Sequence, residues 1–236
     1  MNKTVKLGEG PEVGRIGYGT MQLPGKGVWG ESEDPAGAVE VLRKAVDLGI
    51  DFFDTADSSS VLTLCLEVSL EAVKAAAREA HERGATVVLN VSPYAKVGAD
   101  LLDLVDVLVV NAHELADLTG QPDFDPLGDW SGVVQATRAA MGESGPTIAV
   151  VTLGANGART LDLEAGTASA QIPSPKIKPV DTTGSGDAFL ASLAFRLASG
   201  DELADACAFA VRVGAYAATG EGAQNSYPSA EQLANW

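Results

Sequence analysis

A glycine-containing turn precedes an apolar stretch in the C-terminal part of the sequence. Residues 181–187 read Asp-Thr-Thr-Gly-Ser-Gly-Asp, and an Ala-rich helix is predicted over about 186–198. The first N–H groups of a helix have no partners inside it, and the helix dipole favours negative charge there. Gly184 and Gly186 would let a phosphate approach this backbone closely. The pattern therefore predicts an anion site at Gly184, Ser185 and Gly186; the alternative is an ordinary capping turn.

The elements that must position this turn alternate along the chain. Continuous apolar runs, typical of buried parallel strands, occur at 61–66, 86–91, 107–110 and 147–152. Helices are predicted at 70–83, 101–105, 114–118, 132–141, 186–198 and 202–218, and a hairpin at 159–172. The alternation predicts an α/β fold with a mainly parallel central sheet. We expect one three-layer α/β/α domain that includes residues 1–236.

The first segment has its own signals. Residues 5–19 predict a hairpin and a following strand, Asp34-Pro35 starts a helix that stops at Gly49, and 50–53 is a short strand. These elements form a β-α-β unit, whose crossover we expect to be right-handed. Asp54 and Asp57 follow its last strand, where capping of the next turn is their simplest role.

Composition excludes several functions. The chain has 16 Lys and Arg against 32 Asp and Glu, a formal charge of −16, which argues against binding nucleic acid or anionic lipid. No apolar run approaches the ~20 residues of a membrane span, and we expect no signal peptide. Cys65 and Cys207 are expected to be buried, reduced thiols, which fits a cytoplasmic location.

Ordered motifs give residues 61–236 a family resemblance. They are Leu89-Asn90-Val91-Ser92-Pro93, Asn111 to Glu114, Thr152-Leu153-Gly154-Ala155-Asn156-Gly157, the 181–187 turn and Gly222-Ala223-Gln224. Together they resemble the ribokinase, or phosphofructokinase-B-type, carbohydrate kinases, although Ser185 stands where that family has Ala. The resemblance implies a ribokinase-like fold and ATP-dependent phosphoryl transfer to a sugar hydroxyl.

The resemblance also implies roles for particular residues. Asp187 would be the general base, and Gly184, Ser185 and Gly186 the anion hole for the transferring phosphoryl group. Asn111 and Glu114 would organise Mg²⁺, a hard cation that few carboxylates and several waters suit. A strand-end Asn and a helix N-terminal Glu without ligand remain the alternative.

Further implied roles concern the nucleotide and a second cation. Thr152, Gly154 and Gly157 would touch the nucleotide phosphates of ATP. Ala208 and Val211 would line an adenine pocket, although the polar residue that many family members have at the position of Val211 is absent. Asp181 and Thr183, with residues 222–226, would hold a monovalent cation such as K⁺ through mostly carbonyl oxygens.

The N-terminal segment, residues 1–58, resembles a different family. Gly17-Tyr18-Gly19-Thr20-Met21 and Phe53 to Ser58 look like the opening of an aldo-keto reductase, whose fold is a TIM barrel. Asp54 matches that family's catalytic Asp, but Ser59 stands where its Tyr is expected, and the strands carrying its Lys and His are missing. The sequence therefore resembles a chimera joined near 58–61, in which hydride transfer is not expected.

The leading functional prediction is a ribokinase-like carbohydrate-kinase fragment with retained ATP-site motifs. The early Asp, Gly-Gly motif and β-sheet lid by which this family binds sugar are not found in residues 1–60, so little sugar phosphorylation is expected. Two alternatives are a folded recombination chimera without enzymatic activity and, third, an oxidoreductase. An alternative arrangement is a homodimer that forms through an exposed sheet edge or apolar face.

Overall fold

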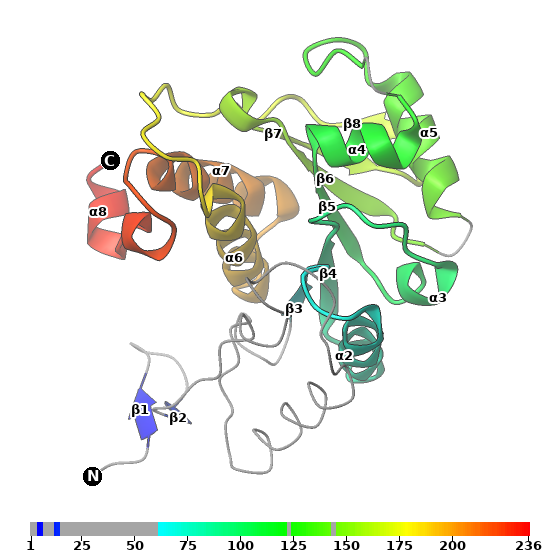
Figure 1. Cartoon of the computed structure of the whole chain (residues 1–236), viewed down its shortest axis with the longest axis horizontal. Coiled ribbons are helices and arrows are strands. Elements are labelled where there is room, and N and C mark those ends of the chain that lie inside the picture. Colours follow the sequence, from blue (N-terminus) through cyan, green and yellow to red (C-terminus); the bar gives the residue numbers. More distant parts are fainter. Residues whose placement is uncertain (1–3, 7–11, 15–60, 122–123, 143–144) are drawn as a thin grey trace.

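A six-stranded sheet organises the part of the chain that the structure describes. The computed structural model describes residues 4–6, 12–14, 61–121, 124–142 and 145–236 (Figure 1). The strands lie side by side in sequence order: β3 (Val61–Leu64), β4 (Thr86–Asn90), β5 (Val107–Asn111), β6 (Ile148–Thr152), β7 (Ala158–Asp162) and β8 (Thr167–Ala168). β3 to β6 are parallel, whereas β7 and β8 continue the sheet in antiparallel pairing. The sheet is therefore mixed and mostly parallel, as predicted.

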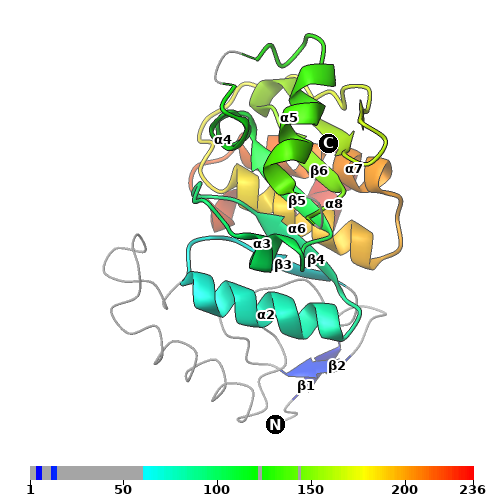
Figure 2. The same cartoon turned by 90° about the vertical axis from the view of Figure 1, so that its right-hand side faces the viewer.

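Helices cover both faces of this sheet. One face carries α2 (Leu70–Glu82), α3 (Ala99–Leu102), α4 (Ala112–Thr119) and α5 (Ser131–Met141), and the other carries α6 (Ser185–Ala198) and α7 (Leu203–Ala217) (Figures 1 and 2). The parallel strands are added to the sheet in one direction, and the connections between them are right-handed. Such connections place their helices on the same face of the sheet. The short α8 (Ala230–Ala234) and the 3₁₀ turns η2 (Gly154–Asn156) and η3 (Gln224–Ser226) complete the described body.

The strand residues alternate between two cores. Leu89, Leu108 and Val151 face the α2–α5 side, whereas Val88, Val109 and Val150 face α6 and α7. All six are buried. Both faces of each central strand are thus apolar, which explains the continuous apolar runs in the sequence.

Local signals set the helix ends near their predicted positions. The Ser69 side chain accepts a hydrogen bond from the N–H of Ala72 (3.3 Å), and α2 ends just before Gly84, whose φ is +74°. The predicted helix at 101–105 is a single turn, α3, that begins and ends earlier than expected. The predicted hairpin at 159–172 is present as β7 and β8 with an additional bridge between Ala158 and Ile172.

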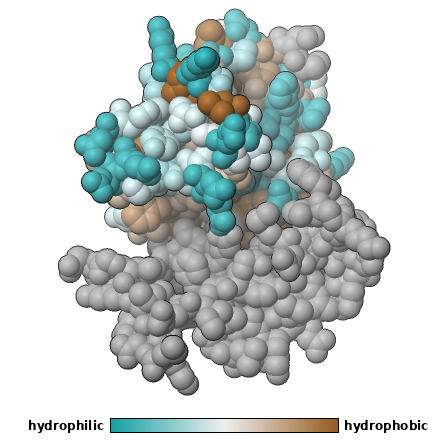
Figure 3. Space-filling view, turned by 60° about the vertical axis from the view of Figure 1, so that its left-hand side comes forward, coloured by the Kyte–Doolittle hydropathy of each residue, from teal (hydrophilic) through white to brown (hydrophobic). Residues whose placement is uncertain are grey.

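The N-terminal predictions are only partly within the described residues. β1 (Thr4–Lys6) and β2 (Glu12–Gly14) pair antiparallel, in line with the predicted hairpin. The predicted helix from Asp34, the strand 50–53, Asp54 and Asp57 lie outside the described residues. No described helix is long and apolar enough to cross a membrane. Figure 3 shows a face of the described body on which hydrophilic and neutral residues dominate, with a few separate apolar ones.

Candidate active site

Several predicted site residues meet at the carboxyl edge of the parallel strands. Asn111 ends β5 and is in register with Thr152, the last residue of β6. β3 packs against α6, and the segment that follows β3 carries Glu67, whose pKa is raised in part by the charge of Asp187 in the first turn of α6. Ligands of open α/β sheets bind outside the carboxyl ends of the strands. This edge is therefore the candidate site.

The turn before α6 is packed on one side and open on the other. Gly184 has φ +76° and supplies no side-chain cap to the helix. A Cβ at Gly184 would lie 2.7 Å from the Tyr227 hydroxyl and 2.8 Å from the Ala223 Cβ, whereas a Cβ at Gly186 would meet nothing within 4 Å. The open side at Gly186 leaves room for an anion beside the first turn of a helix of 14 residues.

Asp187 lies in the first turn of α6, close to a second carboxyl group. Glu67 follows β3, and its pKa is raised first by burial and then by the negative charge of Asp187. Burial is also the main cause of the raised pKa of Cys65; a backbone hydrogen bond from Glu67 lowers that pKa, and the negative charges of Glu67 and Asp187 raise it further. The sequence analysis missed Glu67; an acid just beyond an apolar strand was the available signal.

Asp181 ties the turn to a distant loop. Its Oδ1 accepts from the N–H of Thr183 (2.9 Å), and its Oδ2 accepts from the N–H of Gly222 (3.0 Å). Hydrogen bonds from the Thr183 side chain, the Thr183 N–H and the Gly222 N–H lower the pKa of Asp181. The structure thus brings together Asp181, Thr183 and the 222–226 segment, which the cation prediction required. Because both carboxylate oxygens accept backbone hydrogen bonds, carbonyl oxygens would supply most ligands to a cation there.

Asn111 and Glu114 form the capping box of α4. The Asn111 Oδ1 accepts from the N–H groups of His113 and Glu114 (2.9 Å each), and the Glu114 Oε2 accepts from the Asn111 N–H (2.8 Å). Glu114 is only 7% exposed. This is the geometry expected if Asn111 and Glu114 cap the helix and bind no ligand. It leaves the second carboxylate oxygen of Glu114 without a role in the capping box.

The loop after β6 has a conformation that requires glycine. Gly157 has φ +85°, and a Cβ there would clash with the carbonyl oxygen of Ile172. The Leu153 N–H donates to the Gly157 carbonyl (2.7 Å), which closes the loop around η2. Gly154, at φ +56°, begins η2. The predicted phosphate loop therefore lies at the carboxyl edge, directly after Thr152.

The two predicted adenine residues have different surroundings. Val211 is buried in the core between α7, α6 and the sheet, whereas Ala208 is exposed. Neither lines the pocket described below. Their adenine role stays a prediction. Among the described residues, no group of three or more His, Cys, Asp or Glu side chains could hold a metal ion.

The order of motifs along this edge is matched in a known family. Residues 39–230 match the model of the pfkB family carbohydrate kinases. The chain belongs to the pfkB family. It is 34% identical over 170 residues to a ribokinase of Schizosaccharomyces pombe, which covers 72% of this chain and 52% of that protein. It is 33% identical over 176 residues to a deoxyribokinase of Salmonella typhi, covering 73% and 54%. The chain therefore spans about half the length of these curated relatives.

Solved structures of pfkB-type kinases have the same fold. Arabidopsis thaliana ribokinase, solved with ribose and ATP, has a TM-score of 0.65 at 26% identity, with 74% of this chain and 55% of that chain covered. Aminoimidazole riboside kinase from Salmonella enterica, solved with aminoimidazole riboside and an ATP analogue, has a TM-score of 0.60 at 27% identity, covering 74% and 61%.

These matches bear on the predicted joint near residues 58–61. The pfkB match begins at residue 39, inside the segment 1–58 that resembles a reductase. None of the relatives or structures described above is a reductase. The kinase family thus extends further toward the N-terminus than the motifs indicated, and the reductase part of the prediction has no support from these matches.

Proposed function

We propose that this chain binds the phosphates of Mg-ATP at the carboxyl edge of its sheet and retains, at most weakly, phosphoryl transfer to a sugar hydroxyl. The observation that carries the proposal is the Gly184–Asp187 turn. Its Gly186 side is open at the start of α6, and Asp187 lies near the Glu67 carboxyl group. A helix N-terminus with glycine at the contact point suits a phosphate.

In this proposal each residue has a physical task. The N–H groups at Gly184, Ser185 and Gly186 bind the developing negative charge of the phosphoryl group. The Asp187 carboxylate accepts the proton of the attacking hydroxyl. Thr152, Gly154 and Gly157 hold the remaining phosphates, and the loop between Asp181 and Gly222 supplies carbonyl oxygens to a monovalent cation.

Glu114 fits a magnesium role only through one oxygen. Its Oε2 is bound to the Asn111 N–H, so the other oxygen, or a water bound to it, would contact the cation. When bound, Mg²⁺ neutralises charge that develops on the phosphates.

Efficient transfer needs more than these groups. Orientation of the acceptor can supply ~7–11 kcal/mol of barrier lowering, and a base with an anion site does not replace it. The sequence of residues 1–60 shows none of the family's sugar-binding motifs. We therefore propose nucleotide binding as the retained property.

Thermal unfolding with Mg-ATP tests the proposal. A ligand at 100 times its dissociation constant adds about 2.7 kcal/mol to stability, so the midpoint should rise. Gly186→Glu should abolish the rise, because it places a carboxylate in the anion site. Gly132→Glu is the matched control: Gly132 is also the second residue of a helix, α5, and its Cβ would meet nothing within 4 Å. No rise with millimolar Mg-ATP in the unaltered chain, or an equal rise in Gly186→Glu, contradicts the proposal.

A second proposal concerns the origin of the N-terminal segment. The residues 17–21 and 53–58 support an aldo-keto reductase origin for part of residues 1–58, joined to a kinase portion as a chimera. NADPH in the same melting experiment tests whether any reductase function accompanies that origin. We expect no shift, because Ser59 replaces the required Tyr. A shift with NADPH but not with Mg-ATP would reverse the assignment of function.

A further inference from the structure

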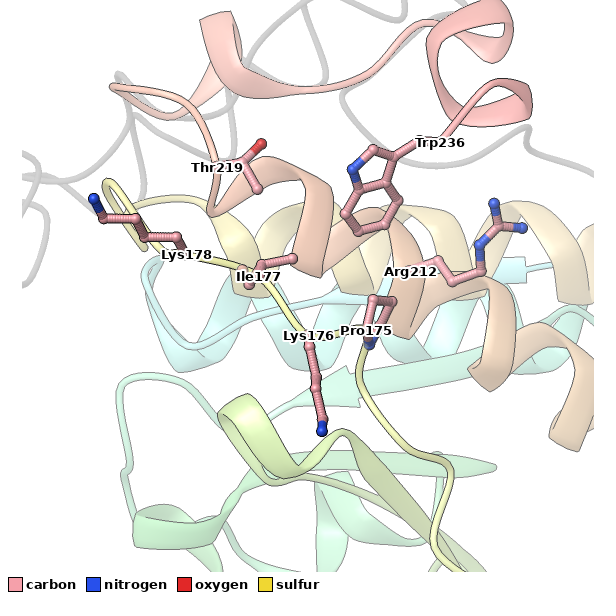
Figure 4. Close-up of a pocket in the computed structure, with 7 residues that line it drawn as sticks. All are labelled: Pro175, Lys176, Ile177, Lys178, Arg212, Thr219 and Trp236. Carbon is pink, nitrogen blue, oxygen red and sulfur yellow. The ribbon is translucent and has the colours of Figure 1, made fainter.

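A pocket lies apart from the Gly184 turn, on the outer side of α7. It has a volume of about 400 Å³ and is lined by residues 175–178, Arg212, Thr219 and Trp236 (Figure 4). Its walls come from three parts of the chain: the extended segment before Asp181, the α7 region and the segment after α8. None of the residues assigned above to phosphate, nucleotide or metal lines it.

The charge of this pocket is opposite to that of the whole chain. Lys176, Lys178 and Arg212 line it and no carboxylate side chain does, although Asp and Glu outnumber Lys and Arg by 32 to 16 in the sequence. Neither lysine belongs to the ion pairs of the described residues, which involve Lys74, Arg83 and Arg196. A pocket that is lined by cations and by no carboxylate side chain attracts small anions.

Arg212 is the cation that the structure holds in place. One nitrogen of its guanidinium group donates to the carbonyl of Leu233 (3.1 Å), which joins α7 to the end of α8. The other N–H groups can donate further, and a guanidinium group suits a carboxylate or phosphate in two-point contact. In Figure 4 Arg212 lies beside Trp236, whereas Lys176 points away from Trp236.

Between the charged side chains the pocket is apolar. Trp236 is 42% exposed, and its indole meets the ring of Tyr216 edge to face, with centroids 5.3 Å apart. Pro175 and Ile177 are half-buried and lie on the opposite wall. In the view of Figure 4 Lys178 and Arg212 occupy the two ends of a row that contains Ile177 and Trp236. An exposed indole next to aliphatic side chains favours a flat ring.

We propose that this pocket binds a small organic anion that carries an aromatic ring. The ring packs between Trp236 and the Pro175–Ile177 wall, and the anionic group pairs with Arg212. Lys178 adds attraction from the other end. The lining residues of this pocket include none that the proposed nucleotide site uses.

Calorimetric titration of the full chain with phenyl phosphate tests the proposal. We expect saturable binding, and about 10-fold weaker binding of phenol, which lacks the charge, and of inorganic phosphate, which lacks the ring. Arg212→Met and Trp236→Leu should each weaken binding by about 10-fold, and Arg212→Lys should weaken it less. Arg78→Met, at an exposed arginine on α2, is the control that should change nothing. Unchanged binding in Arg212→Met, or equal affinity for inorganic phosphate, overturns the proposal.

A second comparison separates this site from the α6 turn, which could also take the phosphate group. Gly186→Glu should leave phenyl phosphate binding unchanged, and Arg212→Met should leave the Mg-ATP melting shift unchanged. Loss of phenyl phosphate binding in Gly186→Glu would assign the probe to the α6 turn and overturn the pocket proposal. Far-ultraviolet circular dichroism and the melting midpoint of each variant show that it is folded before its binding is compared.

Discussion

At Gly184, backbone conformation and packing both exclude a side chain. Its φ is +76°, and a Cβ would lie 2.7 Å from the Tyr227 hydroxyl. Gly184→Ala is therefore expected to lower the free energy of unfolding by about 1–3 kcal/mol in urea denaturation. Gly84→Ala is the control, because Gly84 has φ +74° but open space around its Cβ position. It should cost only about 1 kcal/mol, the penalty of a left-handed backbone conformation for alanine. Equal losses in the two variants would show that contact with Tyr227 contributes nothing.

Ser185 stands in the anion turn with a buried hydroxyl that has no hydrogen-bond partner among the described residues. Removing such a group removes a desolvation penalty. Ser185→Ala, which restores the alanine of the family motif, should leave stability unchanged or raise it by up to about 1 kcal/mol. Ser226 is the contrast, since its Oγ donates to the Ala223 carbonyl (2.6 Å). Ser226→Ala should cost about 0.5–1.5 kcal/mol. A marked loss in Ser185→Ala would mean that its hydroxyl has a partner in solution.

At the scale of elements, α4 combines a structural cap with a proposed metal role. Asn111→Ala removes the acceptor of two first-turn N–H groups and should cost about 1–2 kcal/mol in urea denaturation. Glu114→Gln keeps an oxygen that can accept from the Asn111 N–H but loses the negative charge. Its stability should change little, whereas the magnesium dependence of the ATP melting shift should be lost. Full magnesium dependence in Glu114→Gln would limit Glu114 to capping.

Asp181 connects two elements, the turn before α6 and the loop after α7. Asp181 accepts from the Gly222 N–H, and the Tyr227 hydroxyl, five residues later, fills the space that a Cβ at Gly184 would need. The loop after α7 therefore packs against the turn before α6 at both positions. Neither contact is visible in the periodicity of the sequence, although the 181–187 and 222–224 motifs place the two segments in one site by resemblance.

At the scale of the whole molecule, the sheet separates two cores, and α6 and α7 close one of them. Leu193 on α6 is fully buried in the cluster with Val88 and Val109. Leu193→Ala should cost about 2–5 kcal/mol, because the cavity collapses only in part. Leu127, 58% exposed, is the control, and Leu127→Ala should stay within about 0.5 kcal/mol of the unaltered chain. A small effect of Leu193→Ala in urea denaturation would mean that the α6 layer packs loosely in solution.

The sheet edge at β3 concerns the molecule as a whole as well. Among the described strands, β3 pairs only with β4. An edge strand can pair with another chain, so the homodimer through an exposed sheet edge remains a prediction for this protein.

The sequence by itself determined most of the elements and the place of the motifs in them. The runs 86–91, 107–110 and 147–152 are apolar on both faces, so they predicted buried parallel strands that the structure contains as β4, β5 and β6. Glycines at 184 and 157 marked turns that their positive φ angles confirm. Such features depend on local backbone preference and on burial, which neighbouring residues specify.

Only the tertiary structure decided what surrounds these motifs. It brought Glu67 near Asp187, Tyr227 against Gly184, and Trp236 beside Arg212 and Ile177. It also gave Asn111 and Glu114 a capping box, which their residue types allowed but did not require. Contacts between residues far apart in the chain depend on strand order and on the face that each crossover helix covers. Those properties follow from packing the whole domain, and no local pattern encodes them.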